Sequence, residues 1–275
     1  MRLNFKTAIS VVIFPLLLQN CSSDDGGSQP SNEEWGAIQV KFENRFEGLS
    51  PIILNQTIQT SSSGQSHQFS ALKYIVSNFT LTNQAGQEYT YHFNDPDKGA
   101  FIIDQNDAVI NEIIIDLDSI PAGNYTKVKF GLGISPEAYL LGGESQGEFW
   151  ADANQEGMAW GWATGYVFVV LEGKYGATIP DTDFLNHTGN MGDVTQNGTP
   201  NLYREVELEF PTQMEVSTQA FPAIHITADL NQFLSGETNL VLDASNHDEM
   251  GSSQHLLNVT NNLSKMFSVD HIHNN

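Results

Sequence analysis

Cysteine and basic side chains are both scarce in this chain. Cys21 is the only thiol among 275 residues, so no disulfide can form within one copy, and the fold must be held by core burial with or without bound metal. Only 11 Lys and Arg accompany 33 Asp and Glu, which gives a net charge of −22. Nucleic acid and anionic lipid headgroups are therefore poor partners, because both would repel the acidic chain.

The apolar run near the N-terminus is too short to span a membrane. Residues 8–18 read AISVVIFPLLL, follow Arg2 and Lys6, and run into the sequence LQNC, residues 18–21, which ends at Cys21. This order is typical of a secretory signal peptide, and LQNC resembles the lipobox of bacterial lipoproteins, with Asn20 where a small residue is usual. We predict a signal peptide over residues 1–20 and a lipid anchor at Cys21 that inserts in the bilayer. An ordinary signal peptide cut elsewhere is the alternative.

Residues 21–35 are rich in Ser, Gly and acid, a composition typical of a flexible tether. An acidic stretch directly after the lipidated cysteine also resembles the surface-export signals of Bacteroidetes lipoproteins. We therefore expect the protein to be anchored in the outer membrane and to face the cell surface. A periplasm-facing domain is the alternative.

Residues 36–275 carry many short strand patterns. Ile38, Val40 and Phe42 alternate with polar residues, as in a strand with one buried face. Comparable runs begin at Leu72, Tyr89, Glu112, Tyr125, Gly165, Tyr203 and Ala223, and turn formers lie between them. This pattern predicts one all-β domain, an antiparallel β-sandwich or a partly closed barrel.

One late α-helix is expected over residues 252–267. An apolar stripe of Leu256, Val259, Leu263 and Met266 recurs there at three- and four-residue steps, behind Ser252 and Ser253 as candidate capping residues. A His-rich tail with His271 and His273 follows the helix.

Two motifs offer chemistry that their context does not favour. Ser145 is central in GESQG, a nucleophile-elbow pattern, but that motif acts at a strand-to-helix turn of a parallel α/β sheet. We therefore expect no enzyme activity. Three acidic pairs, at residues 95 and 97, 116 and 118, and 181 and 183, more often serve turns than ions. Structural calcium is kept as the alternative.

The segment GMAWGWATGYVFVVLEG, residues 157–173, is the most informative. On an extended strand Met158, Trp160 and Trp162 would line one face, either as core packing or as a functional surface. Histidine supplies further candidates at positions 187, 225, 247 and 255, because imidazole and thioether are the copper ligands available where no thiolate exists. Each of these histidines could instead be structural, and His67 is expected at the surface.

Together these segments resemble the MbnP-like family of extracytoplasmic copper-binding proteins. The resemblance is carried by GMAWGWATGYVFVVLEG, LKYIVSNFTL, FIIDQND, IPAGNYTKVKFGLGIS, FLNHTGN and IHITADLNQFLSG, and it extends from Ile38 to Met266. It implies copper as the cofactor, and a partner haem enzyme that oxidises a tryptophan to kynurenine. Three departures stand out: GISPEAYL lacks a histidine found in relatives, Asn44 ends a strand that often ends in His, and the family's cysteines are absent.

The leading hypothesis is therefore a non-catalytic surface lipoprotein that binds or handles copper. By the resemblance its ligands would come from His187, Met158, Trp160 and Trp162, with His225, His247 and His255 as weaker candidates. The alternative is a surface adhesion or glycan-binding module without metal, in which Trp150 and other exposed aromatic rings stack on sugars. A purely structural coat protein is a third hypothesis.

Overall fold

Alternating apolar and polar residues form the strands of two sheets in this computed structural model, which describes residues 34–47, 50–140 and 147–274. The predicted signal peptide, Cys21, nearly all of the tether and Ser145 lie outside these ranges. Residues from Glu33 onward form one compact unit. Within the described ranges, no helix combines the length and the apolar character needed to cross a membrane.

The smaller sheet is centred on the first strand. It contains β1 (Trp35–Phe46), β2 (Ser50–Pro51), β7 (Ile113–Pro121), β12 (Ala223–Asp229) and β14 (Phe267–His273). The larger sheet is centred on the long strand β4 (Ser66–Asn83). Its other members are β3 (Gln59–Thr60), β5 (Glu88–Thr90), β6 (Ala100–Asp104), β8 (Gly123–Leu132), β9 (Val169–Gly176), β10 (Thr182–Thr188), β11 (Arg204–Val216) and β13 (Asp248–Gly251).

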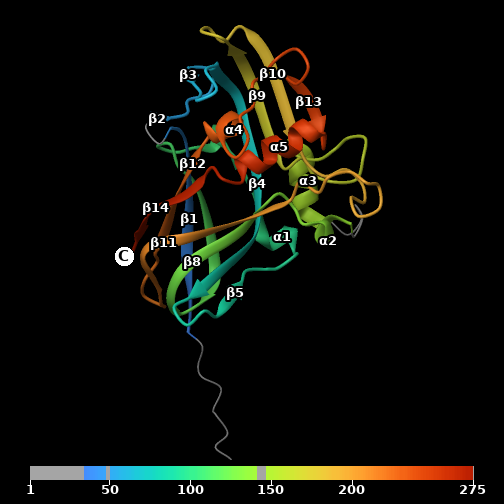
Figure 1. The fold of residues 1–275 in the computed structure, drawn as a ribbon. Coiled ribbons are helices and arrows are strands. Elements are labelled where there is room, and N and C mark those ends of the chain that lie inside the picture. Colours follow the sequence, from blue (N-terminus) through green and yellow to red (C-terminus); the bar gives the residue numbers. More distant parts are fainter. Residues whose placement is uncertain (1–33, 48–49, 141–146, 275) are drawn as a thin grey trace, which may run out of the picture. The chain divides into compact units, whose positions relative to one another are not determined.

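Short helices connect these strands. They are α1 (Pro96–Gly99), the 3₁₀ turn η1 (Gln105–Asp107), α2 (Pro136–Tyr139), α3 (Gly147–Gln155), α4 (Gln232–Ser235) and α5 (Gln254–Leu263). Figure 1 shows β9, β10 and β13 at one end of the molecule and β5 and β8 at the other, with α2 and α3 on one side.

The predicted β-sandwich with few helices is confirmed, and it is not closed into a barrel. Its sheets are mixed rather than purely antiparallel, because β1 pairs with β12 and β10 pairs with β13 in parallel. Parallel neighbours need long connections, and both pairs join segments far apart in the chain. A strand-by-strand alternation pattern carries no information about such pairing.

Aromatic rings from both sheets meet in the core. Phe42 of β1 lies 6.0 Å from Tyr74 of β4 and 5.9 Å from Phe130 of β8, measured between ring centroids. Phe267 of β14 completes the cluster, 5.1 Å from Phe130 and 5.7 Å from Tyr74. These edge-to-face contacts fasten the two sheets to each other.

Asn44 holds a polar network in this core. Its amide nitrogen donates to Gln105 Oε1 at 2.7 Å, and its amide oxygen accepts from Tyr74 Oη at 3.0 Å. Gln105 Nε2 then donates to the carbonyl of Ile52 at 2.9 Å. All partners are satisfied, so the residue serves the fold.

The late helix is confirmed, but the tail after it is a strand. Ser253 caps α5 by accepting from the amide of Leu256 at 3.1 Å. The His-rich segment forms β14, antiparallel to β12, and Asn274 then donates to the carbonyl of Gln213 in β11 at 3.0 Å. The prediction of a surface position for His67 is wrong: it is 1% exposed in β4, with its ring 6.1 Å from Phe184.

Candidate functional site

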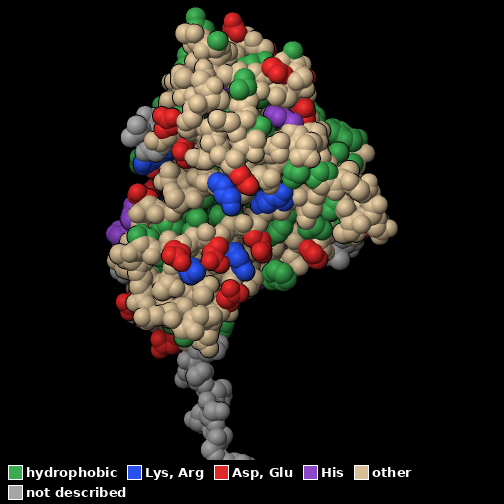
Figure 2. Space-filling view, in the orientation of Figure 1, with side chains coloured by type: hydrophobic (Ala, Val, Ile, Leu, Met, Phe, Trp, Pro, Cys, Tyr) green, Lys and Arg blue, Asp and Glu red, His purple; other side chains and the backbone are tan. Residues whose placement is uncertain are grey.

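The predicted ligand residues do not form one cluster. They divide between the loop 158–165, one end of the larger sheet, the inner side of α5 and the smaller sheet. Figure 2 shows histidine side chains at two separate places on one face of the molecule. Over the described ranges, no three His, Cys, Asp or Glu side chains are arranged to hold a metal ion.

Met158, Trp160 and Trp162 do not share one face, so that prediction is wrong. Met158 is fully buried, Trp160 is 4% exposed and Trp162 is 65% exposed. The reason is that residues 158–165 form a loop closed by the bridge between Ala159 and Tyr166, and the strand begins only at Val169. The two indole rings still touch, with centroids 5.3 Å apart. Met158 and Trp160 are thus packing residues, and Trp162 is the accessible indole.

Trp160 fixes the segment that follows His187. Its Nε1 donates to the carbonyl of Asn190 at 2.8 Å. A Cβ at Gly189 would lie 2.2 Å from the carbonyl oxygen of Tyr166 and 3.1 Å from Trp160 Cζ2, so only glycine fits there. The loop 158–165 therefore packs closely against the HTGN segment, residues 187–190. This contact gives a packing reason for the occurrence of both motifs in one chain.

His187 lies in β10, on the outward side of the larger sheet. Its Nε2 is 2.9 Å from Glu172 Oε1 of β9, and its register partner in β13 is Met250. Since a carboxylate only accepts, Nε2 donates and the lone pair is left on Nδ1. Burial lowers the pKa of His187, and the hydrogen bond to Glu172 opposes that shift, so the ring is neutral near pH 7.

A shallow groove of about 360 Å³ adjoins this histidine. It is lined by Ser70, Glu172, Gly173, Asp183, Phe184, Leu185, His247 and Asp248. His247 Nδ1 lies 3.0 Å from the carbonyl of Asp243, so Nδ1 donates and Nε2 keeps a free lone pair. The groove, with His187 and Met250 at its edge, thus offers imidazole, thioether and carboxylate groups. Met250 is 46% exposed and can be reached from solvent.

His255 is separated from this groove. It lies on α5, and its Nε2 is 3.2 Å from Asn186 Oδ1. Consecutive strand residues point to opposite faces, so the side of β10 that carries Asn186 is opposite the side that carries His187. Burial lowers the pKa of His255. His255 and His187 therefore cannot bind one ion in this fold.

His225 lies on the smaller sheet, in the middle of β12. Its Nδ1 is 3.1 Å from Glu112 Oε1, and its ring stacks on His271 of β14 with centroids 4.0 Å apart. The sequence did not indicate this pairing, because it depends on the unexpected strand β14.

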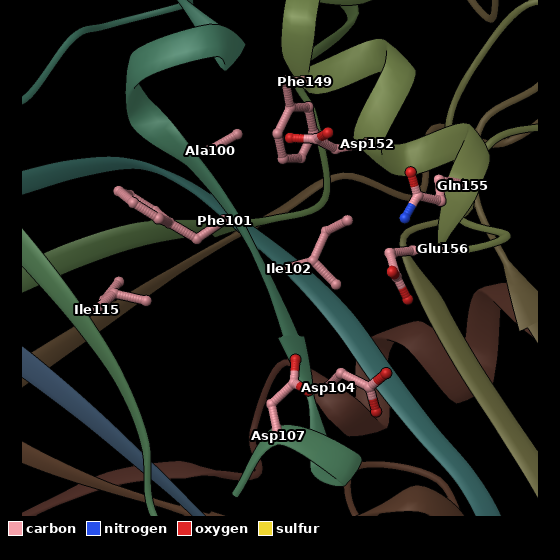
Figure 3. A pocket seen from close by; sticks show the side chains of 10 residues that line it. All are labelled: Ala100, Phe101, Ile102, Asp104, Asp107, Ile115, Phe149, Asp152, Gln155 and Glu156. Carbon is pink, nitrogen blue, oxygen red and sulfur yellow. The ribbon is translucent and has the colours of Figure 1, made fainter.

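A second hollow, of about 350 Å³, lies beside α3 and combines an apolar floor with an acidic rim (Figure 3). Phe101, Ile102, Ile115 and Phe149 lie among the carboxylates of Asp104, Asp107, Asp152 and Glu156. Lys73 bridges two of these acids, with Nζ 2.8 Å from Asp104 and 2.8 Å from Glu156. Although burial opposes it, these two carboxylates raise the pKa of Lys73. This hollow contains none of the predicted ligands.

The acidic pairs considered for calcium mostly have protein partners. Asp97 Oδ1 accepts from the amide of Phe149 at the start of α3, at 2.9 Å. Asp116 accepts from Gln39 at 3.0 Å, and Asp183 is 2.8 Å from Lys174 Nζ. These contacts tie strands and helices together.

Sequence reasoning missed Glu172 as the partner of His187. One signal was present, since Glu172 is the single acid in the otherwise apolar run YVFVVLEG. Met191, directly after HTGN, was also missed. It packs on Gly251, where a Cβ would lie 2.6 Å from Met191 Cε.

Comparison with known proteins gives a family match over most of the domain. The family model described as MbnP matches residues 36–255. Among solved structures, MbnP from Methylosinus trichosporium is 13% identical, with a TM-score of 0.47 and coverage of 78% of this chain and 83% of that one. No curated protein gives a significant match. The chain belongs to the MbnP family.

Proposed function

We propose that this protein is a non-catalytic, lipid-anchored copper-binding protein of the outer membrane, facing the cell surface through the anchor at Cys21. Copper would bind beside His187. The observation that carries the proposal is the His187–Glu172 hydrogen bond of 2.9 Å next to the exposed thioether of Met250. Membership of the MbnP family and the spare Nε2 of His247 at the same groove support it.

The chemistry of these groups suits copper. A carboxylate that accepts from one ring nitrogen orients the imidazole and raises the basicity of the other. Imidazole and thioether together favour copper over calcium or magnesium, and an imidazole–thioether set suits Cu(I). Glu172, Asp183 and Asp248 at the groove give it a negative field that attracts cations.

The structure also bears on the proposed haem-enzyme partner. A separate enzyme that oxidises tryptophan must either contact an exposed indole or remove an electron from one. Trp162, 65% exposed and in contact with buried Trp160, meets that requirement. We therefore propose that such a partner would contact the loop 158–165.

The test is a copper titration of the purified chain from residue 22 onward, without a His tag, against a competing chelator. Loss of one ligand in His187→Ala or Met250→Leu should weaken Cu(I) binding at least about tenfold, and Glu172→Gln should weaken it roughly 10- to 100-fold. His92→Ala is the matched control, because His92 is exposed and lies outside the groove. His67 is unsuitable as a control because it is buried.

Equal affinity in the wild type and His187→Ala would contradict copper binding in this groove. The glycan or adhesion hypothesis would then take its place, with Trp162 as the exposed ring. Trp150 gives it little support, because its ring packs on Tyr166 with centroids 4.9 Å apart and lies against the core. A Trp162→Ala variant tested on a glycan array distinguishes the two functions.

A further inference from the structure

The edge of β6 that faces away from β4 has no partner strand. Among the described strands, β6 pairs only with β4, and Ile102 of β6 is the register partner of Ile75. The amide of Ile75 donates to the carbonyl of Phe168 at 2.9 Å, and its carbonyl accepts from the amide of Gly133 at 2.8 Å. Ile75 therefore makes its hydrogen bonds on the side away from β6. In an antiparallel pair, the amide and carbonyl of Ile102 then point away from β4, to the open edge.

The hollow beside α3 lies along this edge. Consecutive strand residues point to opposite faces, and Figure 3 shows Phe101 and Ile102 on opposite sides of β6. Both side chains line the hollow. A cavity lined by both faces of one strand must lie along the edge of that strand. The space of about 350 Å³ is therefore where a further strand would add to the sheet.

The two sides of the edge differ in chemistry. Phe101 faces the core, because its ring centroid lies 6.1 Å from that of Phe79. The opposite side of β6 carries Asp104, and Lys73 joins it to Glu156, directly after α3. An added strand would meet apolar groups with one face and carboxylates with the other. A segment that alternates apolar and basic residues suits this arrangement.

The charge of the hollow favours a basic partner. Its four carboxylates are those of Asp104, Asp107, Asp152 and Glu156, and among the described residues only Lys73 forms an ion pair with any of them. Four carboxylates and one ammonium group leave three negative charges. Asp107 and Asp152 are exposed, so their charges are accessible from solvent. A basic group is attracted to the hollow, and an acidic group is repelled.

We propose that the edge of β6 binds an extended basic segment of a partner protein, which adds a short strand beside Ile102. Main-chain hydrogen bonds to Ile102 hold the segment, and its Lys or Arg side chains contact the carboxylates of the hollow. A second copy of this chain is a poor partner, because each copy has a net charge of −22. The site contains none of the proposed copper ligands and does not depend on copper binding.

The experiment measures peptide binding to the untagged chain from residue 22 in metal-free buffer, by fluorescence anisotropy. The probe is a labelled, end-blocked peptide of alternating lysine and valine, and the reference peptide has glutamate in place of lysine. The basic peptide should bind with an affinity that falls as salt is added, and the acidic peptide should not bind.

Charge variants test the carboxylates of the hollow. Asp107→Asn combined with Asp152→Asn should weaken binding of the basic peptide at least about fivefold. Asp181→Asn combined with Asp183→Asn is the matched control, because it removes the same charge at exposed positions outside the hollow. The control variant should bind the peptide as the wild type does.

Two measurements test the added strand itself. Ile102→Pro removes the amide proton at the open edge, which edge strands tolerate, and should weaken binding at least about tenfold. Ile102→Ala keeps that proton and should weaken binding less. In the wild type, bound peptide should slow hydrogen exchange at the Ile102 amide, and this measurement decides the question if the proline variant fails to fold.

Three results would overturn the proposal. One is equal binding of the acidic and basic peptides, and another is a bound peptide that leaves hydrogen exchange at Ile102 unchanged. Displacement of the peptide by n-butylamine at the same concentration would make the hollow a site for small cations. A dimer of the wild type that Ile102→Pro abolishes would instead assign the edge to a second copy of this chain.

Discussion

At the residue scale, His67 makes the fold sensitive to acid. Burial lowers its pKa to about 4, Nδ1 has no hydrogen-bond partner, and Nε2 has only a long 3.4 Å contact to Ser61. The unfolded chain, with an ordinary imidazole pKa near 6.5, takes up this proton first as the pH falls. The protonation of His67 therefore leaves the free energy of unfolding unchanged above about pH 7 and lowers it as the pH falls from about 6.5 to 4. By pH 5 the decrease is about 2 kcal/mol.

Urea unfolding at pH 7 and pH 5 checks this prediction in the presence of a metal chelator. His67→Gln should remove about 2 kcal/mol of the difference in unfolding free energy between the two pH values. His92→Gln, at an exposed position, should leave that difference unchanged. An equal pH dependence in His67→Gln and the wild type would show that another group titrates.

The sequence could not reveal the burial of His67, because its neighbours Ser66 and Gln68 are polar and β4 carries no clean alternation there. The candidate site was only partly predictable for a similar reason. His187 stood out as a histidine in a motif, but Glu172 and Met250 reach it through strand register, which no local pattern encodes. The burial of Trp160 and exposure of Trp162 depend on a loop that the extended-strand interpretation did not anticipate.

At the scale of elements, a helix or strand could be predicted when its own residues carry the signal. The helix α5 carries its own cap and an apolar stripe, and both are visible in the sequence. β14 was missed because a bulge at Asp270 breaks its alternation, so that Val269 pairs with Ile226 but His271 pairs with His225. β10 was missed because its buried side is polar, with Asn186 and Thr188 fully buried.

β14 is expected to contribute strongly to stability. Phe267 joins the ring cluster at distances of 5.1 Å to Phe130 and 5.7 Å to Tyr74. Phe267→Ala should lower the free energy of unfolding by about 3–5 kcal/mol, because it removes a buried ring and leaves a cavity. Denaturant unfolding measures this, and Ser268→Ala, exposed in the same strand, should change stability by less than about 0.5 kcal/mol. Similar stabilities of the two variants would mean that β14 is only loosely attached.

At the scale of the whole molecule, charge and anchorage act together. Figure 2 shows basic side chains beside acidic ones on one face of the molecule. Lys127 is an example of such pairing, because its Nζ is 3.2 Å from both Glu207 and Glu209. The excess acid disfavours binding to anionic headgroups, so the proposed membrane attachment would depend on the predicted lipid at Cys21. Cys21→Ser should therefore move the protein from the membrane fraction to the soluble fraction and abolish fatty-acid labelling. Fractionation with immunoblotting measures this, and retention in the membrane would contradict the lipoprotein prediction.

The parallel pairing of β1 with β12 sets the order in which this protein can fold. β1 is synthesised first, yet about 180 residues separate it from the strand beside which it lies. At roughly 5–20 residues per second, the ribosome needs roughly 10 to 40 s to supply that partner. Until then the central strand of the smaller sheet has one unpaired edge, and the sandwich cannot close. A product truncated before β12 exposes an unpaired strand edge, which is a template for aggregation.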